Sequence, residues 1–225
     1  MAEDWKGFAV PGWAVKRVDL WRFLDCCPME MSAFGTALNV EAAATEGRKV
    51  LLGYSMGGRL ALEALLAGGP WDAAVLVSAH AGLETETERI SRRKLDAEWA
   101  ARALEGDWAD FLKAWNAQGV LETGRWVRAM ADRSLLAQRR RSVARSFMDW
   151  SLGTQTPRWD RLKELKLPLL WVAGEKDGKF RDLAARAVES GGFEMWTAPG
   201  VGHRVPWESP EFPGMIGEFL ERAIS

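Results

Sequence analysis

Cysteine and histidine are both scarce in this sequence, and their scarcity narrows the possible classes of protein. The two cysteines, Cys26 and Cys27, are adjacent. Neighbouring residues cannot cross-link distant parts of a fold, so a secreted protein built on disulfides is disfavoured. The pattern instead fits a reducing, cytoplasmic location. Only two histidines, His80 and His203, are present, which leaves two candidates for an imidazole base.

The sequence also lacks an excess of charge and a long hydrophobic run. Its 30 basic and 31 acidic residues almost cancel, so the overall charge predicts neither a nucleic acid partner nor an anionic membrane surface. No run approaches the roughly 20 apolar residues of a membrane span. A chain of 225 residues, 48% of them hydrophobic, is long enough for one sizeable core. No feature of the sequence indicates an oligomeric state.

The most informative motif present is GYSMG at residues 53–57. A short apolar run of strand type, residues 49–52, precedes it, and residues 59–67 have helical periodicity. Gly-x-Ser-x-Gly between a strand and a helix is the arrangement that exposes a serine hydroxyl on a sharp turn. The motif therefore predicts a nucleophile elbow with Ser55 at its tip.

Glycines flank the expected turn on both sides. We expect that a side chain at either Gly53 or Gly57 would crowd the turn against neighbouring backbone. A glycine-rich phosphate loop is the structural alternative. That loop needs a Lys-Ser or Lys-Thr pair after its glycines, and none follows Gly57 and Gly58 here.

Buried parallel strands alternating with helices are predicted along the chain. The five candidate strands are residues 14–20, 49–54, 73–79, 168–174 and 193–198. Such alternation predicts an α/β fold with a mostly parallel sheet covered by helices, and active-site residues at the carboxyl ends of its strands. Residues 1–82 and 157–225 would form this core. Residues 83–156, rich in Arg, Glu, Ala and Trp, would form an inserted helical lid.

An elbow serine needs a base and a group that orients the base, which hydrolases of this architecture supply in the order serine, acid, histidine. Asp177 follows a predicted strand, and His203 follows the last one. His80 precedes the acid, so we expect it to line the pocket or to be structural. The alternative reading of Asp177 is a solvated turn residue.

Stabilisation of an oxyanion would fall to the backbone N–H of Met56, the residue after the serine. A second donor normally comes from a loop with a His-Gly pair, and no such pair precedes Ser55.

These motifs resemble the α/β-hydrolase superfamily and, within it, the SHCHC synthases of menaquinone biosynthesis. The resemblance covers nearly the whole chain from Asp4. It is carried by residues 53–59, 82–83, Arg89, Arg92, 96–99, Trp115, 174–181 and 202–203. It implies an enzyme that eliminates pyruvate from 2-succinyl-5-enolpyruvyl-6-hydroxy-3-cyclohexene-1-carboxylate without metal or cofactor. Ser55 would then act as a base, with His203 and Asp177 activating it.

The substrate implied by this resemblance is a small polycarboxylate with three carboxylates. Planar guanidinium groups bind carboxylates well, so Arg59, Arg92 and Arg145 are the substrate-binding candidates. Each has a solvated helix charge as its alternative. Tyr54 and Trp115 match pocket positions of the family, although aromatic residues also serve simple packing.

The sequence departs from the family at its amino end. Members reach the Asp-Trp pair found here at residues 4–5 only after one or more strands and a His-Gly-Phe type loop. We expect Met1 to be an internal methionine, with the missing strands and the second oxyanion donor upstream of it. In the sheet, one of those missing strands would lie between the strands formed by residues 14–20 and 49–54. Two alternative functions remain open: a carboxylesterase or thioesterase of the same fold, and an inactive or partner-binding derivative.

Overall fold

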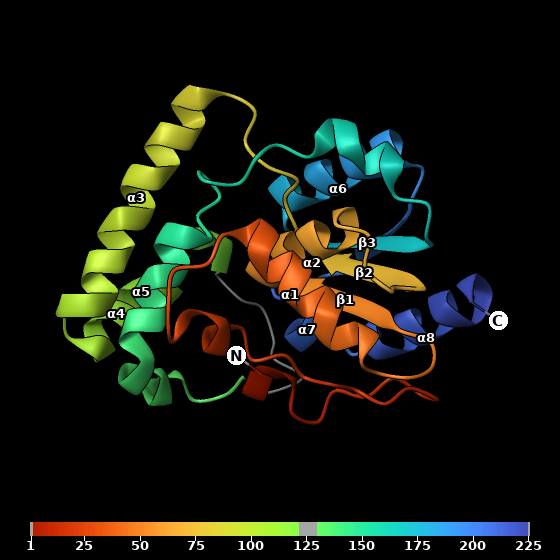
Figure 1. Ribbon diagram of the computed structural model, residues 1–225, viewed down its shortest axis with the longest axis horizontal. Coiled ribbons are helices and arrows are strands. Elements are labelled where there is room, and N and C mark those ends of the chain that lie inside the picture. The colour runs from red at the N-terminus through yellow and green to blue at the C-terminus, as the bar shows by residue number, and fades with distance from the viewer. Residues whose placement is uncertain (1, 122–129, 225) are drawn as a thin grey trace.

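A four-stranded parallel sheet forms the centre of the protein in the computed structural model, which describes residues 2–121 and 130–224 (Figure 1). Its strands are β1 (Val50–Tyr54), β2 (Ala73–Val77), β3 (Leu169–Gly174) and β4 (Glu194–Ala198). They lie in the sheet in the same order as in the chain, and every neighbouring pair is parallel. The predicted α/β class is confirmed. Met1 lies outside the described residues.

Helices cover both faces of this sheet. One face carries α2 (Met56–Leu66) and α6 (Gly178–Gly191), with α1 (Met31–Ala43) packed on α2. The other face carries α8 (Phe212–Ala223). Shorter helical turns complete the chain: η1 (Ala2–Trp5), η2 (Leu20–Leu24), η3 (Gly119–Leu121), η5 (Trp159–Glu164) and α7 (Val205–Glu208).

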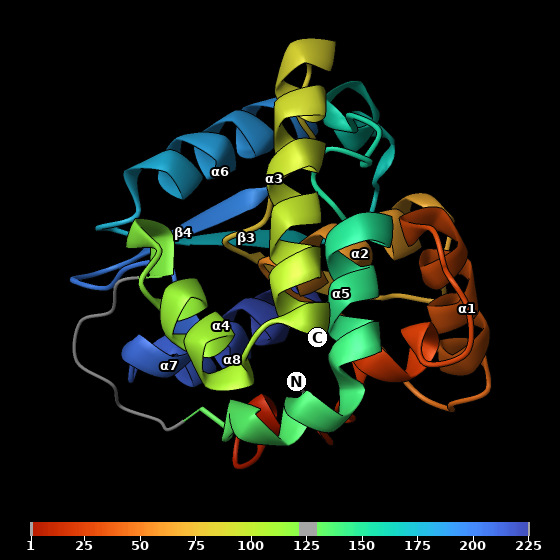
Figure 2. The same ribbon diagram turned by 90° about the vertical axis from the view of Figure 1, so that its left-hand side faces the viewer.

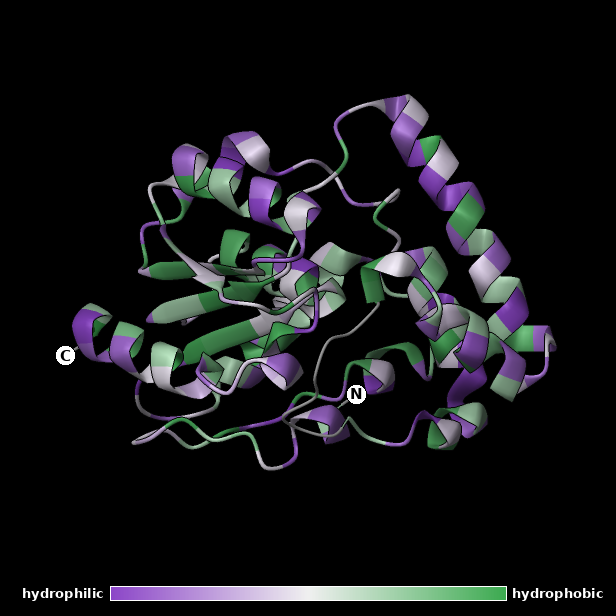
Figure 3. Cartoon of the chain, turned by 180° about the vertical axis from the view of Figure 1, so that it is seen from behind, coloured by the Kyte–Doolittle hydropathy of each residue, from purple (hydrophilic) through white to green (hydrophobic). Residues whose placement is uncertain are grey.

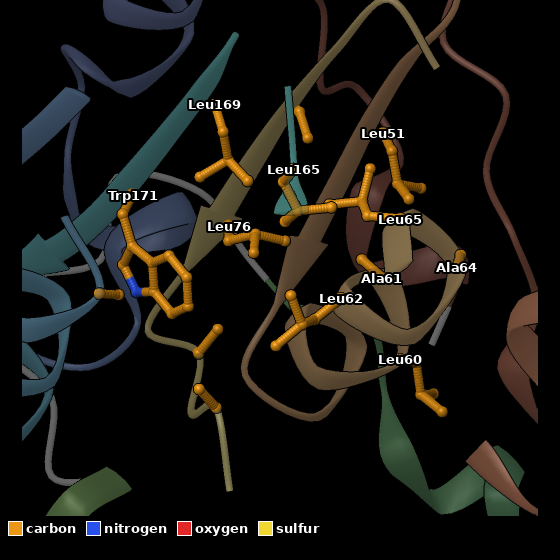
Figure 4. Packing of buried hydrophobic residues seen from close by; sticks show 14 of the residues in the cluster. Leu51, Leu60, Ala61, Leu62, Ala64, Leu65, Leu76, Leu165, Leu169 and Trp171 are labelled. Carbon is orange, nitrogen blue, oxygen red and sulfur yellow. The ribbon is translucent and has the colours of Figure 1, made fainter. Parts of the chain in front are cut away.

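The two-residue period of the strands divides the core into two layers. On β3, Leu169, Trp171 and Ala173 join the layer beneath α2 and α6, whereas Leu170 and Val172 join the layer beneath α8. Figure 4 shows the first layer, in which Trp171 and Leu169 lie beside the leucines of α2. Because both faces are buried, the sequence of β3 is a continuous apolar run, as expected for a parallel strand.

Most of the segment between β2 and β3 forms a helical group to one side of the sheet in Figure 1, and this group faces the viewer in Figure 2. It contains α3 (Glu86–Glu105), α4 (Trp108–Asn116), η4 (Arg133–Arg139) and α5 (Arg140–Asp149). A capping box between Thr85 and Glu88 starts α3. The group has its own apolar cluster, which includes Phe111 and Val143. The division into a core and a lid stays a prediction.

The predicted strand at residues 14–20 is wrong. These residues belong to no strand, and residues 14–17 are exposed. A strand needs a neighbour to pair with, because its backbone groups bond across the ladder. Strand β1 forms the edge of the sheet that faces this segment, but among the described residues β1 pairs only with β2, and the cavity is lined by both β1 and residues 14–18.

Hydrophobic residues concentrate on the strands, and hydrophilic residues concentrate on the outward turns of the helices (Figure 3). Within the described residues, no helix is both long and apolar enough to cross a membrane.

Candidate active site

A strained turn places Ser55 between β1 and α2. Its φ is 51°, in the left-handed region that non-glycine residues seldom occupy. The backbone N–H of Ser55 donates to the carbonyl of Val77 at 2.8 Å, which ties the turn to the end of β2. Ser55 is the N-cap of α2, yet its side chain makes no capping hydrogen bond. The hydroxyl is therefore available for other contacts.

The glycines around Ser55 have different roles from those expected. A Cβ at Gly53 would lie 2.5 Å from the carbonyl oxygen of Gly57, so Gly53 is required as predicted. A Cβ at Gly57 would meet only Leu20, at 4.0 Å, and the expectation of crowding there is wrong. Gly58 is the second tight position, since its Cβ would lie 2.7 Å from that of Ala79. At Gly58 the first turn of α2 packs against Ala79, which follows the end of β2, whereas Gly57 has no closer neighbour than Leu20.

Ser55, His203 and Asp177 lie in a hydrogen-bonded row. His203 Nε2 is 3.1 Å from Ser55 Oγ, and His203 Nδ1 is 2.7 Å from Asp177 Oδ2. Asp177 also caps α6, where its Oδ1 accepts from the N–H of Phe180 at 3.5 Å. His203 and Asp177 are buried, and Ser55 is half-buried. An imidazole in this position can take the serine proton while the carboxylate holds the ring.

Three further residues hold His203, and the sequence did not single them out for this role. Ser78 donates from Oγ to the backbone carbonyl of His203 at 3.0 Å, and its own φ is 48°. The ring of Phe180 lies 4.4 Å from the imidazole. Glu208 accepts the N–H of Gly202 at 2.8 Å. Only Phe180 gave a signal, because it belongs to the motif at residues 174–181.

Tyr54 packs beside the row. Its ring centroid lies 5.5 Å from that of His203 and 4.9 Å from that of Trp207. Burial raises the pKa of the Tyr54 phenol well above its usual range, so this side chain is a neutral wall.

Met56 is the first residue of α2. The first N–H groups of a helix have no partner within it, and the side chain of Ser55 does not cap them. The N–H of Met56 is consequently free of intrahelical bonds at the position expected for an oxyanion donor.

A cavity of about 580 Å³ opens beside Ser55. Its wall includes Arg59 and Tyr54 from the core and Arg92 and Trp115 from the helical segment. It also extends along β1 toward residues 14–18. The structure thus brings the elbow together with four of the five predicted substrate-binding side chains.

Arg59 is buried in the cavity wall. One amino group of its guanidinium donates to the carbonyl of Trp150 at 2.9 Å, and the other lies 3.5 Å from Oε1 of Gln155. Burial lowers the pKa of Arg59, and the nearby charge of Arg92 lowers it further. The carboxylate of Asp96 raises the pKa of Arg59 but does not offset these two effects.

Arg92 is held by a buried carboxylate. Its Nε donates to Asp96 Oδ2 at 2.9 Å, and the same oxygen accepts from Ser151 Oγ at 2.6 Å. Asp96 is 2% exposed. Since Arg92 keeps its remaining N–H donors beside the cavity, the pair orients a cation without consuming all of its hydrogen bonds.

Arg145 lies elsewhere. Its guanidinium donates to the carbonyls of Leu24 at 2.5 Å and Asp25 at 3.3 Å, and it is not part of the cavity wall. The side chain joins α5 to η2, so the structure does not bring this candidate to the site.

Four arginines that we did not predict also line the cavity: Arg17, Arg48, Arg133 and Arg204. Arg204 donates to Oδ1 of Asn116 at 2.9 Å, and Arg133 pairs with Asp4 at 3.0 Å. Trp115 forms part of an aromatic wall, with ring centroids 5.2 Å from Trp99 and 5.0 Å from Phe147. In the described part of the chain, no group of three or more His, Cys, Asp or Glu residues could hold a metal ion.

Comparison with known proteins agrees with this fold. A family profile described as the alpha/beta hydrolase family matches residues 11–212. The chain belongs to that family.

Two relatives of the chain have the same enzyme name. The chain is 34% identical over 140 residues to a 2-succinyl-6-hydroxy-2,4-cyclohexadiene-1-carboxylate synthase of Citrobacter koseri. The matched region covers 60% of this chain and 54% of the relative. The chain is 32% identical over 162 residues to the synthase of Salmonella paratyphi B, covering 71% and 63%. The chain therefore spans less than two thirds of either relative. The solved structure of MenH from S. aureus has a TM-score of 0.77 at 24% identity, covering 96% of this chain and 82% of that one.

Proposed function

We propose that this protein is a cofactor-independent lyase that eliminates pyruvate from 2-succinyl-5-enolpyruvyl-6-hydroxy-3-cyclohexene-1-carboxylate, as a step of menaquinone biosynthesis. One observation carries the proposal: the row of Ser55, His203 and Asp177 opens onto the same cavity as Arg59 and Arg92. The names of the relatives support the substrate class.

The proposed reaction begins with a proton transfer. His203 Nε2 accepts the proton of Ser55 Oγ, and Asp177 stabilises the resulting imidazolium. The serine oxygen then removes a carbon-bound proton from the substrate ring. The electron pair left on carbon expels the enolpyruvyl oxygen, so one C–H and one C–O bond break and a ring double bond forms. The released enolpyruvate takes up one proton to become pyruvate, and the loss of the proton from the His203 imidazolium balances this step and restores the neutral base.

Charge that develops during this elimination needs stabilisation. The N–H of Met56 is the donor we assign to the enolate. Tyr54 would exclude water on one side of the imidazole, because its half-buried ring packs against both His203 and Trp207. No carbon–oxygen bond to Ser55 forms in this mechanism.

Substrate carboxylates would bind to Arg59 and Arg92. Both guanidinium groups line the cavity, and each is held by contacts that leave donors free. Trp115 would form an apolar wall for the ring. The helical segment that carries Arg92 and Trp115 would act as the lid, so it would contribute binding groups as well as exclude water.

A carboxylesterase or thioesterase is the second candidate, since the same three residues also serve covalent ester hydrolysis. The deciding experiment measures pyruvate release from the enolpyruvyl substrate beside p-nitrophenyl ester hydrolysis. Pyruvate release that is lost in Ser55→Ala supports the lyase. Ester turnover without pyruvate release rejects it in favour of the hydrolase, and the loss of both activities favours an inactive or partner-binding derivative.

A further inference from the structure

His80 is the one cavity-lining histidine that the mechanism above does not use. It lies just after β2, is 6% exposed and belongs to the cavity wall. Its ring packs edge-on against Trp159, with the centroids 6.0 Å apart. A structural histidine would have both ring nitrogens satisfied by the protein, so the partners of each nitrogen decide its role.

The hydrogen bond at Nδ1 fixes the state of the ring. The backbone N–H of Gly82 donates to His80 Nδ1 at 2.9 Å. A nitrogen that accepts a hydrogen bond carries no proton, so the neutral ring must carry its proton on Nε2. Burial lowers the pKa of His80 to about 4, and the charges of Lys179, Arg59 and Arg92 act in the same direction. The imidazole is therefore a neutral donor at physiological pH.

Two hydrogen bonds and one close backbone contact hold the loop that carries His80. Its backbone carbonyl accepts from Nε2 of Gln155 at 3.1 Å, and the carbonyl of Gly82 accepts from the indole of Trp159 at 2.8 Å. A Cβ at Gly82 would lie 2.7 Å from Cα of Pro157, which shows how closely the two segments pack. A donor fixed in this way loses little entropy when it binds a ligand.

Nε2 is the free end of this arrangement. Among the residues that the structure describes, it has no hydrogen-bond partner, and it is not one of the fully buried unpaired atoms. Because His80 lines the cavity, we assign this nitrogen to the cavity. Gln155 links the His80 loop to Arg59, because its Oε1 lies 3.5 Å from the guanidinium and its Nε2 donates to the backbone carbonyl of His80 at 3.1 Å.

We propose that His80 is a ligand-binding residue whose Nε2–H donates to an oxygen of the anion held by Arg59 and Arg92. The inference rests on the proposed polycarboxylate site, and it adds a donor without adding a third charge. His80 cannot serve as the base of the reaction, since its free nitrogen carries the proton. Its role is to help select an oxygen acceptor at a defined place in the cavity.

The test uses propane-1,2,3-tricarboxylate as the probe, with affinity measured by titration calorimetry. His80→Phe keeps a ring but removes the donor, and we expect it to weaken binding about tenfold or more. His80→Gln carries an amide nitrogen the same number of bonds from Cα as Nε2, so it should bind within about threefold of the natural protein. Equal affinities for all three proteins, equal losses in both variants, or no binding of the probe by the natural protein would each overturn the proposal.

A second measurement needs no variant. Long-range proton–nitrogen spectra of the natural protein should give the Nε2–H tautomer for His80, and the probe should shift that resonance. A proton on Nδ1, or an unmoved resonance at saturation, contradicts the inference. Pyruvate release by the same sample is measured separately. Probe binding through His80 without pyruvate release would reject the lyase and leave the role of His80 standing.

Discussion

Asp177 Oδ2 lies 2.7 Å from Nδ1 of His203, although 26 residues separate the two in the chain. The carboxylate fixes the orientation of the imidazole, so that Nε2 points toward Ser55. Asp177→Asn keeps the size of the side chain but removes the charge that stabilises an imidazolium. We expect kcat to fall by about 10⁴-fold with little change in KM. Steady-state kinetics of pyruvate release check this, and a loss below tenfold would contradict the assigned role.

Ser55→Ala should remove the activity while leaving the fold in place. The hydroxyl makes no capping bond, so its loss should change the free energy of unfolding little. A positioned proton-transfer group contributes about 10² to 10⁴ in rate, and kcat/KM should fall by at least that factor. Ser134→Ala, at an exposed serine of the helical segment, is the control and should keep full activity.

Arg59→Met should weaken substrate binding, because the side chain lines the cavity and is buried there. Loss of charged hydrogen bonds predicts a drop in kcat/KM of roughly tenfold to hundredfold. Arg145→Met is a matched control, since Arg145 joins α5 to η2 outside the cavity. Its kcat/KM should stay within about threefold even where its melting temperature falls. A reversed order of the two variants would contradict the assignment.

Two glycines of the elbow should respond in opposite ways to alanine. Gly53→Ala would place a Cβ 2.5 Å from a backbone oxygen, so we expect it to destabilise the fold by about 3 kcal/mol. Gly57→Ala meets only Leu20, at 4.0 Å, inside the first turn of α2. There alanine should be neutral or stabilise by about 0.5–1 kcal/mol. Urea unfolding of both variants distinguishes these results.

His80 should make stability depend on pH below neutrality. Its folded pKa of about 4 lies below the usual 6.5, because burial and the cations Lys179, Arg59 and Arg92 outweigh the carboxylate of Glu88. The unfolded chain therefore binds a proton first. The stability that the neutral His80 contributes is fully present above pH 6.5. It is lost as the pH falls toward 4, by up to about 3 kcal/mol.

The comparison that isolates this effect is urea unfolding of the natural protein and His80→Gln at pH 7, 6, 5 and 4.5. The natural protein should lose more unfolding free energy on acidification than the variant. Parallel curves would show that His80 does not titrate in this range.

The sequence was most informative where a local pattern determines the structure. The elbow needs only a strand, a turn residue and a helix in succession, so residues 53–57 could be located from neighbours alone. Strands β2 and β3 were found because both of their faces are buried, which gives continuous apolar runs. Chain order then pointed to Asp177 and His203, which the structure places in hydrogen-bonding distance of one another.

The sequence was less informative where a partner is distant. Residues 14–20 were predicted to be a strand from composition, but pairing depends on a neighbour that composition does not specify. Arg145 was chosen from an approximate alignment with the resembled family, and its direction depends on the carbonyl of Leu24, 121 residues away. Ser78 gave no signal at all, because a serine with φ of 48° looks like any other serine in the sequence.

The edge position of β1 has a consequence for local stability. Half of the amide hydrogens of an edge strand point away from its neighbour, and here that side borders the cavity rather than another described strand. The backbone amides of β1 should consequently be less protected against hydrogen–deuterium exchange than those of β2 and β3, which are paired on both sides. Strand β1, which ends one residue before Ser55, should thus open locally more often than β2 or β3. A ligand bound in the cavity beside β1 should reduce this local opening.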